Sequence, residues 1–488
     1  MKHCVCAGLL LGILGITFFT PRSLAQDLTW EQYTVAARGL RSQGRYQEAE
    51  KLYLDALKSA EGFGAEDPRV ATSLNNLGSL YKILGRFTAA EPLYKRALEI
   101  DRKVSGPEHP TVAITLTNLA VLYECMGKYA LAESLQKQAL DIYAKAGSKD
   151  RDAILAVSNL AQINAAQGKY GEAESMYRRA HEMMKEVLEP DHPDVGGVLN
   201  LLALLCHQQG RYSEAEALYQ RSLAILEAKL DKDHPTLAIA LGNLGQLYQA
   251  QGKYSESERL YQKSLSILEK TLGRDHPTVA SIVTSMAGLY QLQGKYVEAE
   301  PFYLRALETM KKTLGEDHSD VAVALNDLAM LYRNLGRHSE CEPLLRRSLA
   351  IVEKTFGPNH PYVATALDNL AGVKAREGRY ANVEPLYLRA LAIKEKLLGS
   401  DHPDVAMTLN NLGTAYSAAG KYKEAEKLFH RSLAIWEKKL GPNHPTVAAS
   451  LTNLSVFYAK QGKASEAAKT EARASLIRTK LAAMEENK

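Results

Sequence analysis

Apolar side chains recur along the chain at the spacing of an α-helix, in short segments that proline opens and glycine closes. Between Pro403 and Gly420, the residues Leu409, Leu412 and Tyr416 stand at positions i, i+3 and i+7. That spacing puts all three on one face of a helix. Proline is tolerated in the first helical turn, and glycine adopts the left-handed conformation in which helices often end. The segment therefore predicts one amphipathic helix.

The segment after Gly420 carries a second apolar helical face. Ala425, Phe429, Leu433 and Trp436 share one side of a helix that ends before the sequence Gly-Pro-Asn. The two segments together predict a helix–turn–helix unit of about 42 residues.

This unit repeats along the chain. The spacings between successive Gly-Lys or Gly-Arg glycines are 41, 42 and 41 residues, and then 42 residues seven times. A helix pair cannot bury its apolar face alone, so neighbouring pairs stack around one continuous core. We expect an all-α, right-handed α-solenoid superhelix of about eleven helix–turn–helix repeats that fills residues 26–488. The expected helix pairs span about 28–62, 68–105, 109–146, 151–188, 192–230, 234–272, 276–314, 318–356, 360–398, 402–440 and 444–485.

Two positions of the unit hold small residues in nearly every repeat. Seven residues before the glycine stands alanine, glycine or serine, and five residues after it stands mostly alanine. Small residues let two helix backbones approach closely, while leucine and tyrosine fill the adjacent space. Cys341 and Val383 occupy the second of these positions, so Cys341 needs no redox role.

The order leucine, small residue, tyrosine, glycine, tyrosine, alanine resembles the tetratricopeptide repeat. The 42-residue length and the run Leu-Asn-Asn-Leu at residues 74–77 and 409–412 are similar to the kinesin light chain type of this repeat. Such repeats are widespread in bacteria, and we expect a bacterial protein. The N-terminal residues resemble a secretion signal, and no heptad repeats are present that could form a coiled coil with a heavy chain. Both features argue against a kinesin subunit. The resemblance implies that the first helix of each pair lines a concave groove that binds partner peptides.

The resemblance also implies candidate peptide-binding residues. The position just before the second leucine of this run holds an amide in seven repeats, and an amide can pair with any peptide unit because it offers a donor and an acceptor. Alternatively, these amides bond neighbouring helices and fix the repeat geometry. The row is broken at Leu201, Ser285 and Asp327, so we expect binding mainly toward residues 369–453. The seven asparagines are Asn76, Asn118, Asn159, Asn243, Asn369, Asn411 and Asn453.

Charged groove candidates are few. Neither the first Asn position nor the position three residues before it holds a lysine or arginine, which argues against the lysine clamp for chaperone tails known in one subgroup of the family. Arg333 and Arg376 lie one repeat apart and could bind an acidic side chain of a ligand. The alternative is that both are ordinary solvated side chains.

No catalytic, metal or cofactor site is predicted. Eight histidines recur between repeats, but successive ones are a whole repeat apart, whereas metal ligands must converge within a few ångströms. We expect each to pack or bond locally at the start of a helix. No phosphate loop, nucleophile elbow or dinucleotide fingerprint appears in its required context. The eight are His109, His192, His234, His276, His318, His360, His402 and His444.

The first residues predict export. A lysine, an apolar run at residues 5–19 and the small residues Ser23 and Ala25 fit a signal peptide over residues 1–25, with an uncleaved N-terminal anchor as the alternative. We therefore expect a secreted or periplasmic protein with no membrane span after cleavage. The net charge of +4, from 60 basic and 56 acidic residues, is too small and too dispersed for a nucleic-acid binder.

These observations predict a non-enzymatic scaffold that binds an extended or helical segment of a partner protein. The alternatives are a structural spacer or an accessory subunit of an envelope complex. The polar last helix, residues 470–488, suits a capping repeat, so we expect a monomer.

Overall fold

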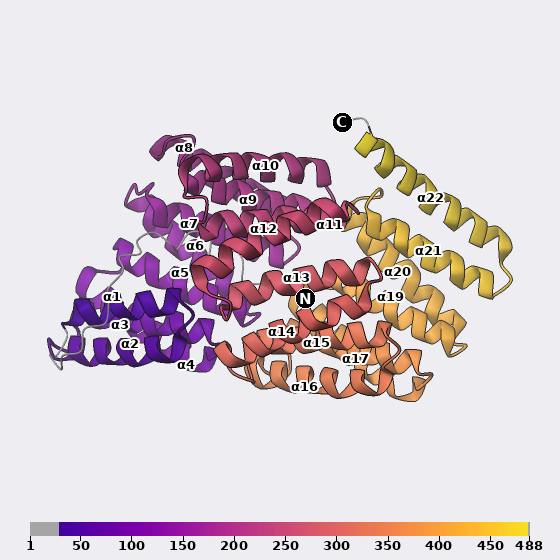
Figure 1. The fold of residues 1–488 in the computed structure, drawn as a ribbon, viewed down its shortest axis with the longest axis horizontal. Helices are drawn as coiled ribbons and strands as arrows, with labels where there is room; N and C mark the ends of the chain where they lie inside the picture. Colours follow the sequence, from indigo (N-terminus) through magenta and orange to yellow (C-terminus); the bar gives the residue numbers. More distant parts are fainter. Residues whose placement is uncertain (1–28, 487–488) are drawn as a thin grey trace. The chain divides into compact units, whose positions relative to one another are not determined.

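A computed structural model of the 488-residue chain describes residues 29–486, and the predicted signal peptide lies outside them. This part of the chain contains twenty-two α-helices, one 3-10 helix and no β-strand (Figure 1). The expected all-α repeat solenoid is confirmed.

The helices alternate between the first and second members of eleven pairs. The first helices are α1 (Trp30–Ser42), α3 (Pro68–Ile83), α5 (Pro110–Cys125), α7 (Arg151–Ala166), α9 (Pro193–Gln208), α11 (Pro235–Ala250), α13 (Pro277–Leu292), α15 (Ser319–Asn334), α17 (Pro361–Arg376), α19 (Pro403–Ala418) and α21 (Pro445–Lys460). The second helices are α2 (Tyr46–Glu61), α4 (Phe87–Ser105), α6 (Tyr129–Lys145), α8 (Tyr170–Val187), α10 (Tyr212–Lys229), α12 (Tyr254–Leu272), α14 (Tyr296–Leu314), α16 (His338–Phe356), α18 (Glu384–Leu398), α20 (Tyr422–Leu440) and α22 (Ala464–Glu486).

The described residues divide into two compact units. Residues 29–204 and 216–331 form one unit, and residues 205–215 and 332–486 form the other. Every contact described below lies within one of these units.

Local chemistry sets the helix ends. The Nδ1 atom of His444 accepts a hydrogen bond from the backbone N–H of Thr446 at 3.1 Å, and Pro445 fills the first position of α21. All eight connecting histidines make this bond to the residue two positions later, which confirms their expected local role. Gly420 lies in the turn between α19 and α20 and has φ of +79°, a conformation that favours glycine.

The small positions are explained by aromatic side chains of the partner helix. A Cβ atom on Gly245 would lie 2.9 Å from Cε1 of Tyr261, which is itself fully buried. Gly78 has the same relation to Tyr94, at 3.0 Å. The second helix therefore packs a ring directly against the backbone of the first.

A hydrogen-bonded latch joins successive repeats. The Tyr416 hydroxyl donates to a carboxylate oxygen of Glu384 at 2.8 Å, and Lys421 Nζ lies 2.6 Å from the other oxygen. The Lys421 ammonium also lies 4.9 Å from the Tyr416 ring centre. The same tyrosine–glutamate bond recurs at residues 123 and 91, 248 and 216, 290 and 258, and 458 and 426.

The ninth repeat departs from the pattern at the start of its second helix. Val383 is fully buried in the small position, and the preceding turn, Tyr380–Asn382, is a 3-10 helix, so that α18 begins only at Glu384. Valine replaces the alanine that most repeats have at this position. A cavity of about 150 Å³ lies beside it, lined in part by Leu412 and Tyr416.

Candidate functional site

The seven candidate asparagines all lie on first helices, from α3 to α21. Asn243 is buried, Asn453 is exposed and the other five are half-buried. The repeat geometry thus gives every member of the row the same register on its helix, one residue before a buried leucine.

Three of these asparagines bond to the preceding repeat. Nδ2 of Asn118 donates to Oδ1 of Asn75 at 3.2 Å. Asn243 donates in the same way to Asn200 at 3.3 Å, and Asn453 to Asn410 at 3.3 Å. These bonds favour the geometric role for the three side chains. One bond leaves each amide with a second N–H and a carbonyl oxygen, so peptide binding remains chemically compatible with it.

The accepting position, one residue earlier on the helix, is the first Asn position of the Leu-Asn-Asn-Leu run, and its role as an acceptor between repeats was not predicted. Asn200, Asn326 and Asn410 are all buried there. No pattern within one repeat could have found it, because its partner is 43 residues away in the next repeat.

The predicted arginine pair comes together in the structure. Arg333 at the end of α15 is half-buried, and its buried Nε has no hydrogen-bond partner among the described residues. Burial and the nearby positive charge of Arg376 hold the pKa of the Arg333 guanidinium below its usual value. Neither arginine forms an ion pair with a carboxylate of residues 29–486. A half-buried cation with a second positive charge nearby favours an anionic ligand.

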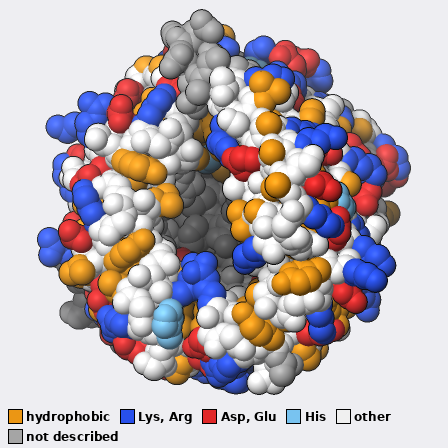
Figure 2. Space-filling view, turned by 90° about the vertical axis from the view of Figure 1, so that its right-hand side faces the viewer, with side chains coloured by type: hydrophobic (Ala, Val, Ile, Leu, Met, Phe, Trp, Pro, Cys, Tyr) orange, Lys and Arg blue, Asp and Glu red, His pale blue; other side chains and the backbone are white. Residues whose placement is uncertain are grey.

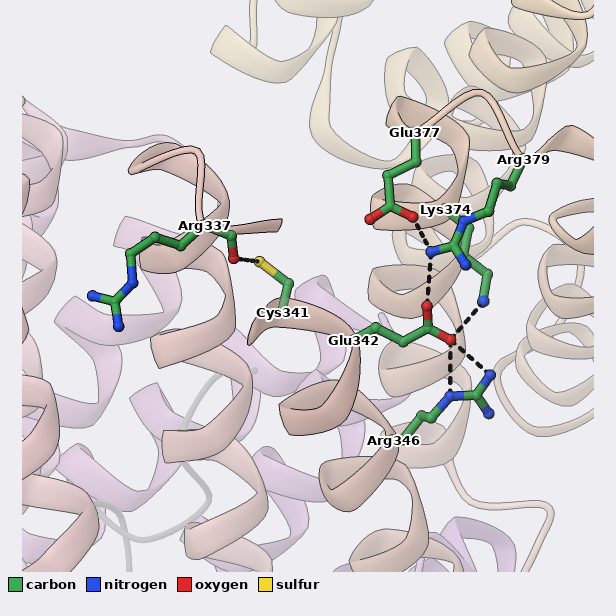
Figure 3. A network of polar contacts seen from close by, with 7 residues as sticks. All are labelled: Arg337, Cys341, Glu342, Arg346, Lys374, Glu377 and Arg379. Atoms are coloured by element: carbon green, nitrogen blue, oxygen red, sulfur yellow. Dashed lines mark hydrogen bonds and ion pairs between the residues drawn. The ribbon is translucent and has the colours of Figure 1, made fainter. Parts of the chain in front are cut away.

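The neighbouring cations are already paired with carboxylates. Glu342 binds Lys374 at 2.7 Å, Arg346 at 2.7 Å and Arg379 at 2.7 Å, and Arg379 also binds Glu377 (Figure 3). The bonds from these cations, of which Lys374 contributes most, hold the pKa of Glu342 at about 2. Lys374 stands where other repeats have the latch tyrosine, so this cluster joins repeats and does not extend the arginine pair.

Glu124 on α5 stands at the same position of its repeat as Arg333. It is buried, and burial raises the pKa of its carboxyl to about 7, while the Gln162 amide donates to it at 2.8 Å and partly opposes the rise. A carboxyl that stays partly protonated near neutral pH is a hydrogen-bonding group more than a fixed charge.

Glu124→Gln is expected to stabilise the protein in a pH-dependent way. Between the ordinary pKa of 4.5 and the folded value of about 7, the folded state binds more protons than the unfolded state, so Glu124 costs stability as pH rises. The gain should reach about 2–3 kcal/mol at about pH 8 and vanish at about pH 4. Denaturant unfolding at both pH values tests this. The exposed Glu172→Gln is the control, and equal gains in the two variants would contradict the assignment.

The surface carries charges of both signs. Figure 2 shows acidic and basic side chains interspersed over one face of the molecule, with apolar side chains in small separate groups. No cluster of three or more histidine, cysteine or acidic side chains suited to a metal occurs among the residues whose side chains are described. No helix within residues 29–486 is both long enough and apolar enough to cross a membrane.

Comparison with known proteins identifies the repeat. The family model for the tetratricopeptide repeat matches overlapping segments across the chain. These are residues 33–103, 71–145, 152–228, 198–270, 236–312, 278–340, 320–396, 362–429 and 404–480. A search of curated proteins found no significant match.

Solved structures similar to this chain include repeat proteins of the kinesin light chain type. One, from Podosopora anserina with nearly identical TPR-like repeats, is 28% identical over 42% of this chain and 97% of its own, with a TM-score of 0.36. BtubC from P. vanneervenii is 24% identical over 48% of this chain and 91% of its own, with a TM-score of 0.38. A Rap protein solved with competence and sporulation factor is 16% identical over 77% of this chain and 99% of its own, with a TM-score of 0.52.

The last of these similarities supports the helical repeat fold alone, and the family model carries the assignment. Its matches extend over nearly all of residues 33–480 and coincide with the helix pairs. The chain belongs to the tetratricopeptide repeat family.

Proposed function

We propose that the chain is a non-enzymatic scaffold that binds a segment of a partner protein along the groove lined by its first helices. The observation that carries the proposal is the row of amides in one register on these helices. In a repeat protein, residues at equivalent positions form a continuous surface, which suits an extended ligand with a repeating backbone.

The arginine pair adds a charged end to this groove. Arg333 and Arg376 carry two positive charges without a carboxylate partner in residues 29–486, and Arg376 lies on α17, the helix that carries Asn369. A ligand with an acidic side chain beside an extended, uncharged stretch would satisfy both features. A spacer or accessory subunit, the second candidate, would need neither the unpaired cations nor solvent access to the amides.

Export is part of the same proposal. A leader over residues 1–25 would place the scaffold in the periplasm or outside the cell, as a monomer whose partners belong to the cell envelope. N-terminal sequencing of the exported chain tests it. A mature chain beginning near residue 26 is the expected result, and a chain that keeps Met1 would favour the N-terminal anchor.

Replacing Asn369, Asn411 and Asn453 together by alanine tests the groove. We expect peptides selected on the wild-type chain from a random library to bind the triple variant at least about tenfold more weakly, which corresponds to about 1.4 kcal/mol. Losing the Asn453–Asn410 bond should cost about 1 kcal/mol of stability, and losing the interaction that Asn369 makes adds to this cost. Titration calorimetry and thermal unfolding measure the two effects separately.

The matched control changes exposed side chains on second helices of the same repeats. Lys396, Lys427 and Lys469 replaced by alanine should leave peptide affinity unchanged. If the asparagine triple variant unfolds at a much lower temperature while its affinity is retained, the row has a structural role and the groove proposal is wrong.

A further inference from the structure

Two of the connecting histidines hold together repeats that are far apart in the sequence. Nε2 of His318, at the start of α15, lies 2.8 Å from the backbone carbonyl oxygen of Ile83, at the end of α3. His276, at the start of α13, packs against the turn that follows α1, where Gly44 lies. Both contacts lie within the unit formed by residues 29–204 and 216–331.

The packing of His276 against the first repeat leaves no space for a side chain at Gly44. A Cβ atom on Gly44 would lie 3.0 Å from Cδ2 of His276 and 3.4 Å from Cδ of Pro277. Apolar side chains continue the contact, because Leu314 from the end of α14 packs in one cluster with Leu80 and Leu84 of the second repeat.

The same geometry recurs in the other unit. A Cβ atom on Gly210, in the turn of the fifth repeat, would lie 2.7 Å from Cδ2 of His444 at the start of α21. In each case the turn between the two helices of one repeat meets the histidine that starts the repeat six further along. A contact built three times from the same two repeat positions follows from the superhelix and is not an accident of one side chain.

Only the neutral ring satisfies these bonds. Nδ1 of His318 accepts the backbone N–H of Asp320 at 3.1 Å, so the ring proton must be on Nε2, which donates to Ile83. Nδ1 of His276 likewise accepts from Thr278 at 3.1 Å. A second proton, on Nδ1, would face a backbone N–H, remove the helix cap and bring a charge into the contact.

Burial makes that charge costly. His276 is 6% exposed and His318 is 7% exposed. Burial lowers the pKa of His276 to about 4, although its bond to Ser42 acts in the opposite direction. The turns of the first two repeats carry basic residues: Arg41, Arg45, Lys82 and Arg86. The segments around the two histidines carry acidic residues: Asp275, Asp317 and Asp320.

We propose that the contacts at His276 and His318 form a clasp, which holds the first two repeats against the seventh and eighth at neutral pH, and that protonation of His276 releases it in mild acid. The sign follows from linkage. Because His276 is harder to protonate in the closed form, it stabilises closure above its ordinary pKa of 6.5, and that stabilisation is lost as pH falls toward about 4. The clasp does not depend on the proposed groove ligand.

A distance measurement on the full chain tests the clasp. Spin labels attached to ketone-bearing amino acids at Gln43 and Arg274, both exposed, leave the native cysteines unchanged. We expect one short distance at about pH 7.5 and a growing longer population as pH falls below about 6.5, at constant helicity by circular dichroism. A single unchanged distance down to about pH 4.5, or a parallel loss of helicity, would overturn the proposal.

The variants separate histidine titration from general acid effects. Asparagine can cap a helix but does not titrate in this range, so His276→Asn should abolish the pH dependence of the distance. His109→Asn is the matched control, since His109 caps α5 through the same bond but is exposed, and it should keep the wild-type response. A His276→Asn variant that opens at the wild-type pH would also refute the clasp.

Discussion

Lys394→Met is expected to destabilise the repeats around α18 by about 3–5 kcal/mol, because it leaves a buried carboxylate without its counter-charge. Nζ of Lys394 lies 2.7 Å from Oδ2 of Asp368 and 3.0 Å from the Thr408 hydroxyl, which donates to the same carboxylate oxygen at 2.7 Å. Lys394 is 1% exposed and Asp368 is 5% exposed. The three side chains join α17, α18 and α19 through the core, where neither charge can be solvated.

Acid should reduce the penalty. Burial raises the pKa of Asp368 even with Lys394 present, so an unpaired Asp368 takes up a proton readily as pH falls. Unfolding in denaturant at about pH 8 and about pH 5, with hydrogen exchange of α17 to α19, measures both effects. Local exchange is needed because a long repeat array does not unfold in a single two-state step.

Two comparisons isolate the buried pair. Lys396→Met removes an exposed charge from the same helix and should change stability by no more than about 0.5 kcal/mol. Lys394→Met combined with Asp368→Leu should recover most of the loss, since it removes both charges. If Lys394→Met proves as mild as Lys396→Met, the pair does not stabilise the core as described.

Ala299→Trp should disrupt the seventh repeat, with a cost of at least about 3 kcal/mol. Ala299 is fully buried in the small position of α14, where the second helix approaches the backbone of its partner α13. An indole there exceeds the available volume, and overpacking of even a few methylene groups is costly. Thermal unfolding and hydrogen exchange of α13 and α14 measure the loss.

Val297→Trp is the matched control. Val297 lies two residues away on the same helix and is 73% exposed, so the same new side chain enters solvent. We expect near-wild-type stability for this variant. Comparable losses in the two variants would show that tryptophan harms α14 for a reason other than close packing.

The helix pairs are predictable because each depends on residues close together in the sequence. Pro403 and Gly420 mark the two ends of α19 through backbone restrictions that act within a few residues. The sequence also shows the positions that hold small residues, but it does not show why they must be small. Gly245 is small because Tyr261 of the next helix packs on it, and a single repeat shows only that both residues occur.

The candidate site was predicted only in part. The register of the asparagines on the first helices follows from the period, and so does the proximity of Arg333 and Arg376. The bond from Asn453 to Asn410 does not, because it depends on how far one helix is rotated against the next. That rotation is the sum of many packing contacts.

The sequence by itself determined the unit of this protein: its period, its helix boundaries, its capping histidines and its family. Capping and amphipathic periodicity act over one or two helical turns, so the local sequence specifies them. The tertiary structure alone decided which repeats meet. Lys394 binds Asp368, which is 26 residues away in the sequence, and His318 bonds to Ile83, which is 235 residues away. Both contacts form because stacking rotates every repeat by an amount that only the packed core defines.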